Sequence, residues 1–154
     1  MKRIVITGAT GFIGIHLMEQ WLEKDSEIYA VIRPHSKNAS RVPKNDHIHV
    51  IELPMEEYDQ LPVIIDSADY FYHLAWEGAT GVGRDDQLLQ AKNISRTASA
   101  LKAAKRIGCR RFVALGTVYE NLVDQILSED VHRKADFYLL SKKCSHEICL
   151  KLAQ

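Results

Sequence analysis

The feature that most constrains this chain lies near its beginning, where an apolar run leads through regularly spaced glycines into an amphipathic segment. Residues 3–7 are rich in β-branched side chains and predict a buried strand. Gly8, Gly11 and Gly14 follow, with two residues between each pair. The next residues carry apolar side chains at helical spacing. The chain therefore begins with a predicted strand, glycine turn and helix.

Each glycine has a distinct role in such a unit. Gly8 permits a tight turn, Gly11 lets a phosphate approach the backbone because it has no Cβ, and Gly14 lets the helix pack closely on the strand. Amides at a helix start and the helix dipole both favour a negative charge. A plain strand-to-helix turn is the alternative, but the context favours a dinucleotide site. The residues expected at this site are Gly8, Thr10, Gly11, Phe12, Ile13 and Gly14.

Strands and helices alternate along the rest of the chain. Strands are expected at residues 3–7, 27–32, 47–52, 69–75 and 111–115. Helices are expected after the glycine turn, briefly within 55–67, over 85–107 with Gly108 as C-cap, and from 137 onward. This alternation predicts one α/β domain over residues 1–154, a doubly wound parallel sheet of order 3-2-1-4-5 with helices on both faces. Ligands should bind at the carboxyl ends of the strands.

The apolar residues of the expected helices define the expected buried faces. They are Phe12, Ile15, Leu17, Trp21 and Leu22; Leu61, Ile64 and Ile65; Leu88, Ala91, Ile94, Ala98 and Leu101; and Phe137, Leu140, Cys144, Ile148 and Leu152. A polar loop is expected from Glu120 to about Asp136.

Composition narrows the classes of partner. The 20 basic and 20 acidic residues balance, so no nucleic acid or anionic membrane surface is indicated. No run is long and apolar enough to span a bilayer, and no signal segment precedes the first strand. Cys109, Cys144 and Cys149 form no CxxC pair, which suits free thiols in the cytoplasm.

The residue after the second strand bears on the type of dinucleotide. An NAD site usually has an acid there, about 20 residues after the glycines, to bind the ribose. This chain has Arg33 instead, with Ser36, Lys37 and Arg41 nearby. These groups could hold a 2′-phosphate, so NADP is expected and NAD remains possible. The alternative is a solvated basic loop.

Tyr138 and Lys142 form a Tyr-x-x-x-Lys pair that would share one helix face. A nearby ammonium stabilises a phenolate and makes the tyrosine usable for proton transfer at neutral pH. Thr117, just past the fifth strand, adds a hydroxyl. The alternative is an ordinary exposed pair at a helix start.

Together these motifs resemble the extended short-chain dehydrogenase/reductase superfamily, whose dinucleotide domain is the Rossmann fold, and most closely its nucleotide-sugar epimerase/dehydratase branch. The resemblance rests on the glycine turn, His73-Leu74-Ala75, Asn93, Thr117-Val118-Tyr119, and the Tyr138/Lys142 pair. It covers essentially the whole chain.

The resemblance implies roles for these residues. Tyr138 would be the catalytic acid or base, Lys142 would hold the nicotinamide ribose and tune Tyr138, and Thr117 would bond the reacting hydroxyl or carbonyl. Leu74 and Ala75 would line the cofactor, and Asn93 would support the geometry beside it. His73 is expected as a packed residue rather than a proton donor.

The chain departs from the family's pattern at three points. The family's Ser-Ser-x-x-Val-Tyr-Gly is here Gly116-Thr117-Val118-Tyr119-Glu120, two residues shorter. Leu53-Pro54-Met55 lacks an aspartate that contacts adenine in many members, so backbone or apolar contacts should hold the base. Family members also continue with a substrate-binding part, which is expected to be absent from this chain.

Two further groups of residues give weaker signals of function. His47 and His49 share a strand face as metal ligands can, but no third ligand accompanies them, so no metal site is expected. Trp76, Glu77, Gly78 and Arg84 follow the fourth strand and could touch substrate, or Arg84 could be solvated.

The sequence thus predicts an NAD(P)-dependent epimerase, dehydratase or reductase module that acts on a nucleotide-activated sugar by Tyr-assisted hydride transfer. The alternative is a dinucleotide-binding or interaction module without turnover of its own. The resemblance also implies a homodimer built from the two long helices, with Ala100, Ala104, Leu139 and Ile148 as surplus apolar residues.

Overall fold

The structure is a computed structural model that describes residues 1–123 and 136–154. The chain forms two compact units, one of Met1–Ala75 with Ser99–Ala114 and the other of Trp76–Ala98 with Leu115–Gln154. Most of the expected polar loop before Asp136 lies outside the described residues.

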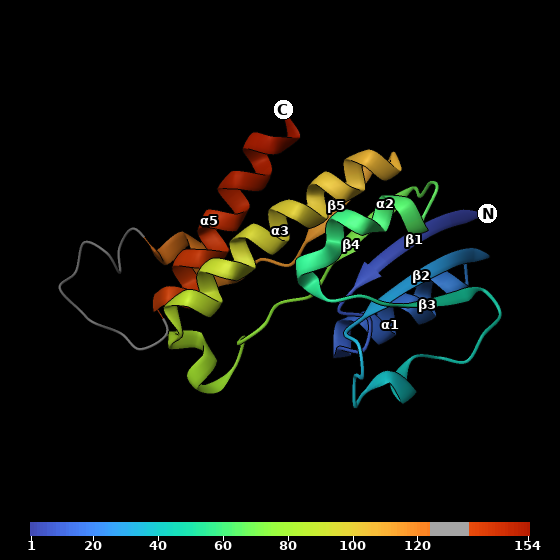
Figure 1. Cartoon of the computed structure of the whole chain (residues 1–154), viewed down its shortest axis with the longest axis horizontal. Coiled ribbons are helices and arrows are strands. Elements are labelled where there is room, and N and C mark those ends of the chain that lie inside the picture. The colour runs from blue at the N-terminus through green and yellow to red at the C-terminus, as the bar shows by residue number, and fades with distance from the viewer. Residues whose placement is uncertain (124–135) are drawn as a thin grey trace. The chain divides into compact units, whose positions relative to one another are not determined.

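The first unit is built on a parallel sheet of five strands (Figure 1). Its strands are β1 (Lys2–Thr7), β2 (Ser26–Ile32), β3 (Ile48–Glu52), β4 (Tyr70–His73) and β5 (Arg111–Ala114). Their order, β3-β2-β1-β4-β5, confirms the predicted topology. Thr7 pairs with Val31 on one side and with His73 on the other, so the carboxyl ends of three strands lie level. This is the edge at which ligands were expected.

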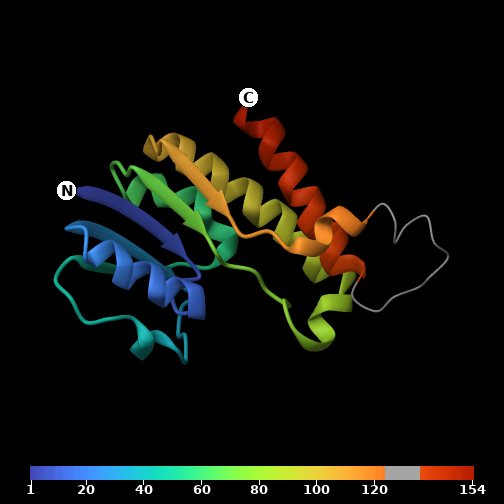
Figure 2. The ribbon, with the colours of Figure 1, turned by 180° about the vertical axis from the view of Figure 1, so that it is seen from behind.

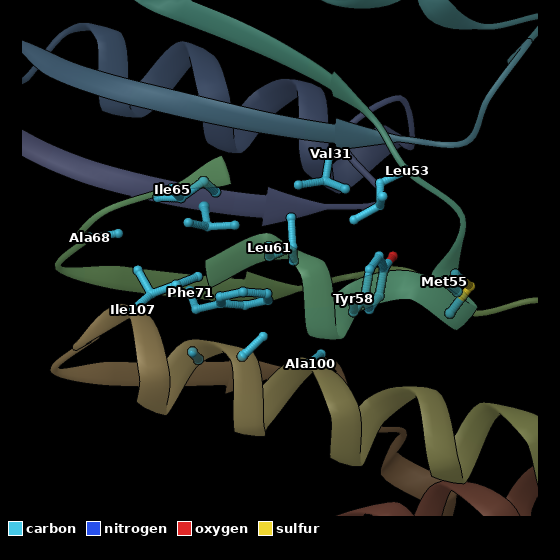
Figure 3. Packing of buried hydrophobic residues seen from close by; sticks show 13 residues of the cluster. Val31, Leu53, Met55, Tyr58, Leu61, Ile65, Ala68, Phe71, Ala100 and Ile107 are labelled. Carbon is cyan, nitrogen blue, oxygen red and sulfur yellow. The ribbon is translucent and has the colours of Figure 1, made fainter. Parts of the chain in front are cut away.

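Helices cover both faces of this sheet, which confirms the doubly wound fold. Helix α1 (Phe12–Leu22) lies over one face (Figure 2). It buries Met18 in a cluster that includes Ile4 and Ile28. The other face is covered by η2 (Met55–Gln60), α2 (Leu61–Ile64) and the C-terminal part of α3 (Gln87–Ile107). Side chains from these elements meet those of the sheet around Phe71 (Figure 3). A short helix, η1 (Ala39–Arg41), follows β2.

Some expected core positions of this unit are wrong. Phe12 is 72% exposed because it stands at the first position of α1, and Ile64 is 48% exposed because α2 is a single turn that buries Leu61. Ala100 and Ala104 are almost fully buried in the unit's own core, so they are not surplus apolar surface.

The second unit combines the N-terminal part of α3 with η3 (Gly81–Asp85), η4 (Val118–Leu122) and α5 (Asp136–Ala153). Helix α5 packs against both η3 and η4. The expected apolar stripe at the start of α3 is wrong, because Leu88 is 77% exposed. The buried residues there are polar: Gln90, Asn93 and Thr97.

Helix α5 differs from its expected face in the same way. Phe137 and Ile148 are about 40% exposed, whereas Ser141, Lys142 and Ser145 are buried. Small and polar groups therefore form the buried side of α5. Within residues 1–123 and 136–154, no helix is long and apolar enough to cross a membrane.

Candidate functional site

The glycine turn has the close backbone packing that the sequence predicted. Gly8 has a positive φ of 69° and leaves no room for a side chain, because a Cβ would lie 2.8 Å from the Ala75 nitrogen and 2.9 Å from the Leu74 carbonyl carbon. The Gly11 amide donates to the Gly8 carbonyl at 3.0 Å. The turn is thus built directly against the segment that follows β4.

Gly14 and Gly11 differ in what surrounds them. A Cβ on Gly14 would lie 2.7 Å from the Gly8 oxygen and 2.8 Å from the Ala9 oxygen, so this glycine lets α1 pack on the turn. A Cβ on Gly11 would meet only the Gly8 oxygen, at 3.2 Å. Gly11 is also the N-cap of α1 and provides no side-chain acceptor for the helix amides. This geometry leaves the helix start suited to an anionic group.

His73 ends β4 as a buried, packed residue. Its Nδ1 lies 2.8 Å from the Thr7 hydroxyl, and its ring stacks on Phe112 at 6.1 Å between centroids. Tyr58 meets the same ring edge-on. These contacts tie the end of β4 to the end of β1, next to the glycine turn.

The segment after β2 presents basic groups to solvent. Arg33, Lys37 and Arg41 are exposed and Ser36 is half-buried. The chain turns at His35, which has a φ of 55° and donates its amide to the Glu52 carboxylate at 3.3 Å. An exposed arginine suits both a 2′-phosphate ligand and a solvated loop. Leu53 and Met55, of the segment that lacks the family's aspartate, are buried in the core.

In the second unit, Gln90 organises the loop between β4 and α3. Its buried amide group donates to the carbonyls of Gly78 at 2.9 Å and Gly83 at 2.7 Å, and its oxygen accepts from the Trp76 indole at 3.0 Å. A Cβ on Gly83 would lie 2.7 Å from the Gly78 Cα, so the loop closes tightly on itself.

Asn93, one turn further along α3, holds the same loop. Its amide nitrogen donates to the Glu77 carbonyl at 2.8 Å, and its oxygen accepts from the Glu77 amide at 3.3 Å. Arg96 forms an ion pair with the Glu77 carboxylate at 2.9 Å. The side chain of the predicted support residue Asn93 thus binds the Glu77 backbone of the loop and accepts from Arg96.

Tyr138 lies near the start of α5 between groups from that loop. The Arg84 guanidinium stands 3.9 Å from the centre of its ring, and Trp76 meets the ring edge-on at 6.0 Å. Arg84 also donates to the Ala79 carbonyl at 3.1 Å, which holds the guanidinium in place. The structure therefore brings Arg84 to the predicted catalytic tyrosine.

Lys142, one turn after Tyr138, is buried, and the exposed-pair alternative does not hold for it. Its ammonium donates to the Leu115 carbonyl at 2.8 Å and lies 3.8 Å from the centre of the Trp76 ring. Burial lowers the pKa of Lys142 to about 8, and the Glu120 charge partly offsets this. The group keeps a cation close to the Tyr138 ring, at 5.9 Å.

Thr117 is the N-cap of η4. Its amide donates to the Glu120 carboxylate at 2.7 Å, and its hydroxyl accepts from the Tyr119 amide at 3.5 Å. The second oxygen of Glu120 lies 3.0 Å from His146 of α5. Glu120 thereby ties η4, and with it Thr117, to the helix that carries Lys142.

Sequence reasoning missed Gln90 and Glu120. Gln90 could have been suspected because it stands one helical turn before Asn93, and Glu120 because Thr117 and Glu120 have the Thr-x-x-Glu spacing of a capping box.

His47 and His49 bind a carboxylate that the sequence did not connect with them. The two oxygens of Glu27 lie 2.7 Å from His47 and 2.6 Å from His49. The Glu27 hydrogen bond raises the pKa of His47, and the two histidines lower the pKa of Glu27. No group of residues in the described part of the chain is arranged to hold a metal ion.

The cysteines of this chain are free thiols. Burial raises the pKa of Cys109 to about 11 and raises that of Cys149. Neither thiol is therefore activated as a nucleophile.

Comparison with known proteins points to one family. A sequence model of the NAD dependent epimerase/dehydratase family matches residues 4–154. The chain is 26% identical to the 3 beta-hydroxysteroid dehydrogenase/Delta 5-->4-isomerase of Mycobacterium tuberculosis over 118 residues. This match covers 73% of this chain and 31% of the relative. It is 29% identical to UDP-glucuronic acid decarboxylase 1 of Arabidopsis thaliana, over 70% of this chain and 25% of the relative.

Solved structures share the fold. The Bordetella bronchiseptica enzyme WbmG, solved in complex with NAD, superposes with a TM-score of 0.79 at 21% identity, over 97% of this chain and 49% of that chain. The chain thus spans about half the length of this structure, and a third or less of the length of the two curated relatives.

Proposed function

The chain belongs to the NAD dependent epimerase/dehydratase family, and from this membership we propose that it binds NADP(H) and carries the proton-transfer residues of an oxidoreductase, epimerase or dehydratase acting on a nucleotide-activated sugar. The observation that carries the proposal is the buried Lys142 ammonium one helical turn from Tyr138. The family membership supports the nicotinamide cofactor, and the similarity to a UDP-glucuronic acid decarboxylase supports the sugar substrate.

The residues present fit a nicotinamide dinucleotide. A Cβ on Gly8 or Gly14 would collide with backbone atoms, so both positions need glycine, and Gly11 keeps the start of α1 free of a side chain where a pyrophosphate would bind. Leu74 and Ala75, against Gly8, would line the same site. The bound nicotinamide would supply hydride transfer.

Tyr138 would move the proton in this reaction. Its phenolic oxygen would take the proton of a substrate hydroxyl as hydride leaves the same carbon, or return it in the reverse direction. Lys142 would hold the nicotinamide ribose and keep a positive charge beside Tyr138. Thr117, fixed by its cap, would bond the reacting oxygen.

Replacing Tyr138 tests this assignment. Tyr138→Phe in the complete natural protein should abolish turnover of UDP-glucuronic acid or UDP-galactose while leaving NADPH binding within a few-fold of wild type. Tyr119→Phe, an exposed tyrosine on η4, is the matched control. Near-normal turnover by Tyr138→Phe would reject the catalytic role. If NADPH raises the melting temperature but no sugar nucleotide turns over, the chain is a binding module instead.

Arg33 would favour NADP over NAD. It follows the last residue of β2 and is exposed to solvent. Arg33→Ser should weaken NADPH binding by about 10- to 150-fold and leave NADH binding unchanged, since a charge-assisted bond to phosphate contributes roughly 1.5–3 kcal/mol. Lys44→Ser, in the same exposed segment, is the control. Tighter binding of NADH than of NADPH by the wild type would contradict the preference.

We also propose that the protein is a homodimer in which α5 contributes to the interface. Ile148 and Leu150 are 39% and 53% exposed on this helix. Analytical ultracentrifugation at high concentration tests the proposal, and a monomer would refute it.

A further inference from the structure

The loop between β4 and α3 supplies a tryptophan that contacts both members of the proposed catalytic pair. The Trp76 ring meets Tyr138 edge-on and carries the Lys142 ammonium on its face, 3.8 Å from its centre. From the sequence alone, Trp76 was a candidate only for contact with substrate. Its position against Tyr138 and Lys142 indicates a different role.

The indole ring is held by a buried glutamine of α3. Gln90 accepts the Trp76 N–H at 3.0 Å, and both hydrogens of its amide are committed to the carbonyls of Gly78 and Gly83. Gln90 is fully buried, so breaking any of these three hydrogen bonds is costly because water does not readily replace the lost partner. A ring held in this way has one orientation.

We propose that Trp76 is a positioning residue for Tyr138 and Lys142, and that Gln90 sets the orientation of its ring. This inference rests on the proposed roles of that pair. The ring face offers the buried ammonium a cation–π contact, and such contacts are strongest when desolvated. With the Leu115 carbonyl on another side, the ammonium is held between two fixed groups. The ring edge limits the orientations open to the Tyr138 phenol.

A fluorescence titration tests the contact without any substrate. The chain has two tryptophans, so in a Trp21→Phe protein Trp76 is the reporter. Burial lowers the pKa of Lys142 to about 8, and the other charged groups beside it are Glu120 and, across Tyr138, Arg84. Loss of the ammonium proton should therefore change Trp76 emission with a midpoint near pH 8.

The expected result is that this transition disappears in Trp21→Phe/Lys142→Met and persists in Trp21→Phe/Lys151→Met, which alters an exposed lysine of the same helix. A transition that survives the loss of Lys142, or no transition in the parent, would overturn the proposal.

A double-mutant cycle on NADPH affinity tests the positioning role itself. Trp76→Leu should weaken NADPH binding about tenfold, and Lys142→Met at least as much. If Trp76 acts through Lys142, the double variant should bind within about twofold of Lys142→Met alone. If the fold-losses in NADPH affinity of the two single variants multiply in the double variant, Trp76 has a merely structural role and the proposal is refuted.

Milder variants guard against misfolding. Trp76→Phe keeps a ring but loses the bond to Gln90, so it should fall between wild type and Trp76→Leu. A Trp76→Phe protein that binds as weakly as Trp76→Leu would contradict a role for the ring face. If the wild type binds neither NADPH nor NADH, the proposed cofactor function fails, and the fluorescence titration still decides the contact.

Discussion

Replacing the three glycines of the turn one at a time with alanine should separate stability from cofactor binding. Gly8, Gly11 and Gly14 differ in conformation and in what a Cβ would meet. Gly8→Ala adds both a strained backbone and a collision, Gly14→Ala adds a collision alone, and Gly11→Ala adds only a close contact. The three variants therefore test three different physical effects at one site.

The magnitudes follow from the geometry. At Gly8 a positive φ costs roughly 1–2 kcal/mol, and overlap with backbone atoms at 2.8 Å adds about 1–3 kcal/mol. At Gly14 the overlap at 2.7 Å costs a similar 1–3 kcal/mol, but alanine regains about 1 kcal/mol of helix propensity. Gly11→Ala should cost less than about 1 kcal/mol.

Melting curves and NADPH titrations are the assay. At roughly 2–4 °C per kcal/mol for a chain of this size, Gly8→Ala should lower the melting temperature by about 4–20 °C and Gly11→Ala by less than about 4 °C. Gly11→Ala should nevertheless weaken NADPH binding at least tenfold, because its Cβ stands where the pyrophosphate approaches.

Gly81→Ala is the matched control for strain. Gly81 has a φ of 61° with nothing within 4 Å of a Cβ, so it shares the backbone cost of Gly8 without the collision. A Gly11→Ala protein that is the least stable of the series, or that binds NADPH normally, would refute this account of the turn.

Two further predictions concern the second unit. Lys142→Met should be more stable than wild type at pH 7 by up to about 3 kcal/mol, because the buried ammonium has its pKa lowered from 10.5 to about 8. Between pH 8 and 10.5 the unfolded chain binds more protons than the folded one, so the stability of the wild type rises with pH. Urea denaturation should therefore show that the stability difference between Lys142→Met and wild type vanishes over this range. Glu120→Gln should lower stability by roughly 1–2 kcal/mol through loss of the carboxylate that accepts from the Thr117 amide and contacts His146. Glu147→Gln, exposed on the same helix, should leave the melting temperature within about 1 °C.

The sheet and its turn were predictable because their signals are local. β-branched runs such as that of β1 specify strands wherever they pack, and a right-handed crossover leaves few orders for five parallel strands. The need for glycine at Gly8 and Gly14 comes from backbone atoms of the turn and its neighbours, so the spacing of the glycines was enough to predict the turn. The start of α5 was predicted to within one residue from Phe137.

The contacts of the candidate site could not be predicted in the same way. Trp76 and Lys142 are 66 positions apart, and no periodicity links a loop residue to a helix residue at that distance. Apolar residues at helical spacing gave a wrong buried face at Leu88, because that method assumes that the buried face of a helix is apolar. The buried residues there are Gln90, Asn93 and Thr97.

That polar face explains how the second unit can hold a loop in one arrangement. Apolar side chains stabilise a buried face but can pack in many orientations. A side-chain amide whose two N–H groups and oxygen are all hydrogen-bonded is held in one orientation. Gln90 and Asn93 together bind the backbone of the loop at Glu77, Gly78 and Gly83. An apolar residue at position 90 would preserve the helix and leave the carbonyls of Gly78 and Gly83 without their donor. The first half of α3 is thus polar where the site requires a fixed loop, and its second half is apolar where the sheet requires a core.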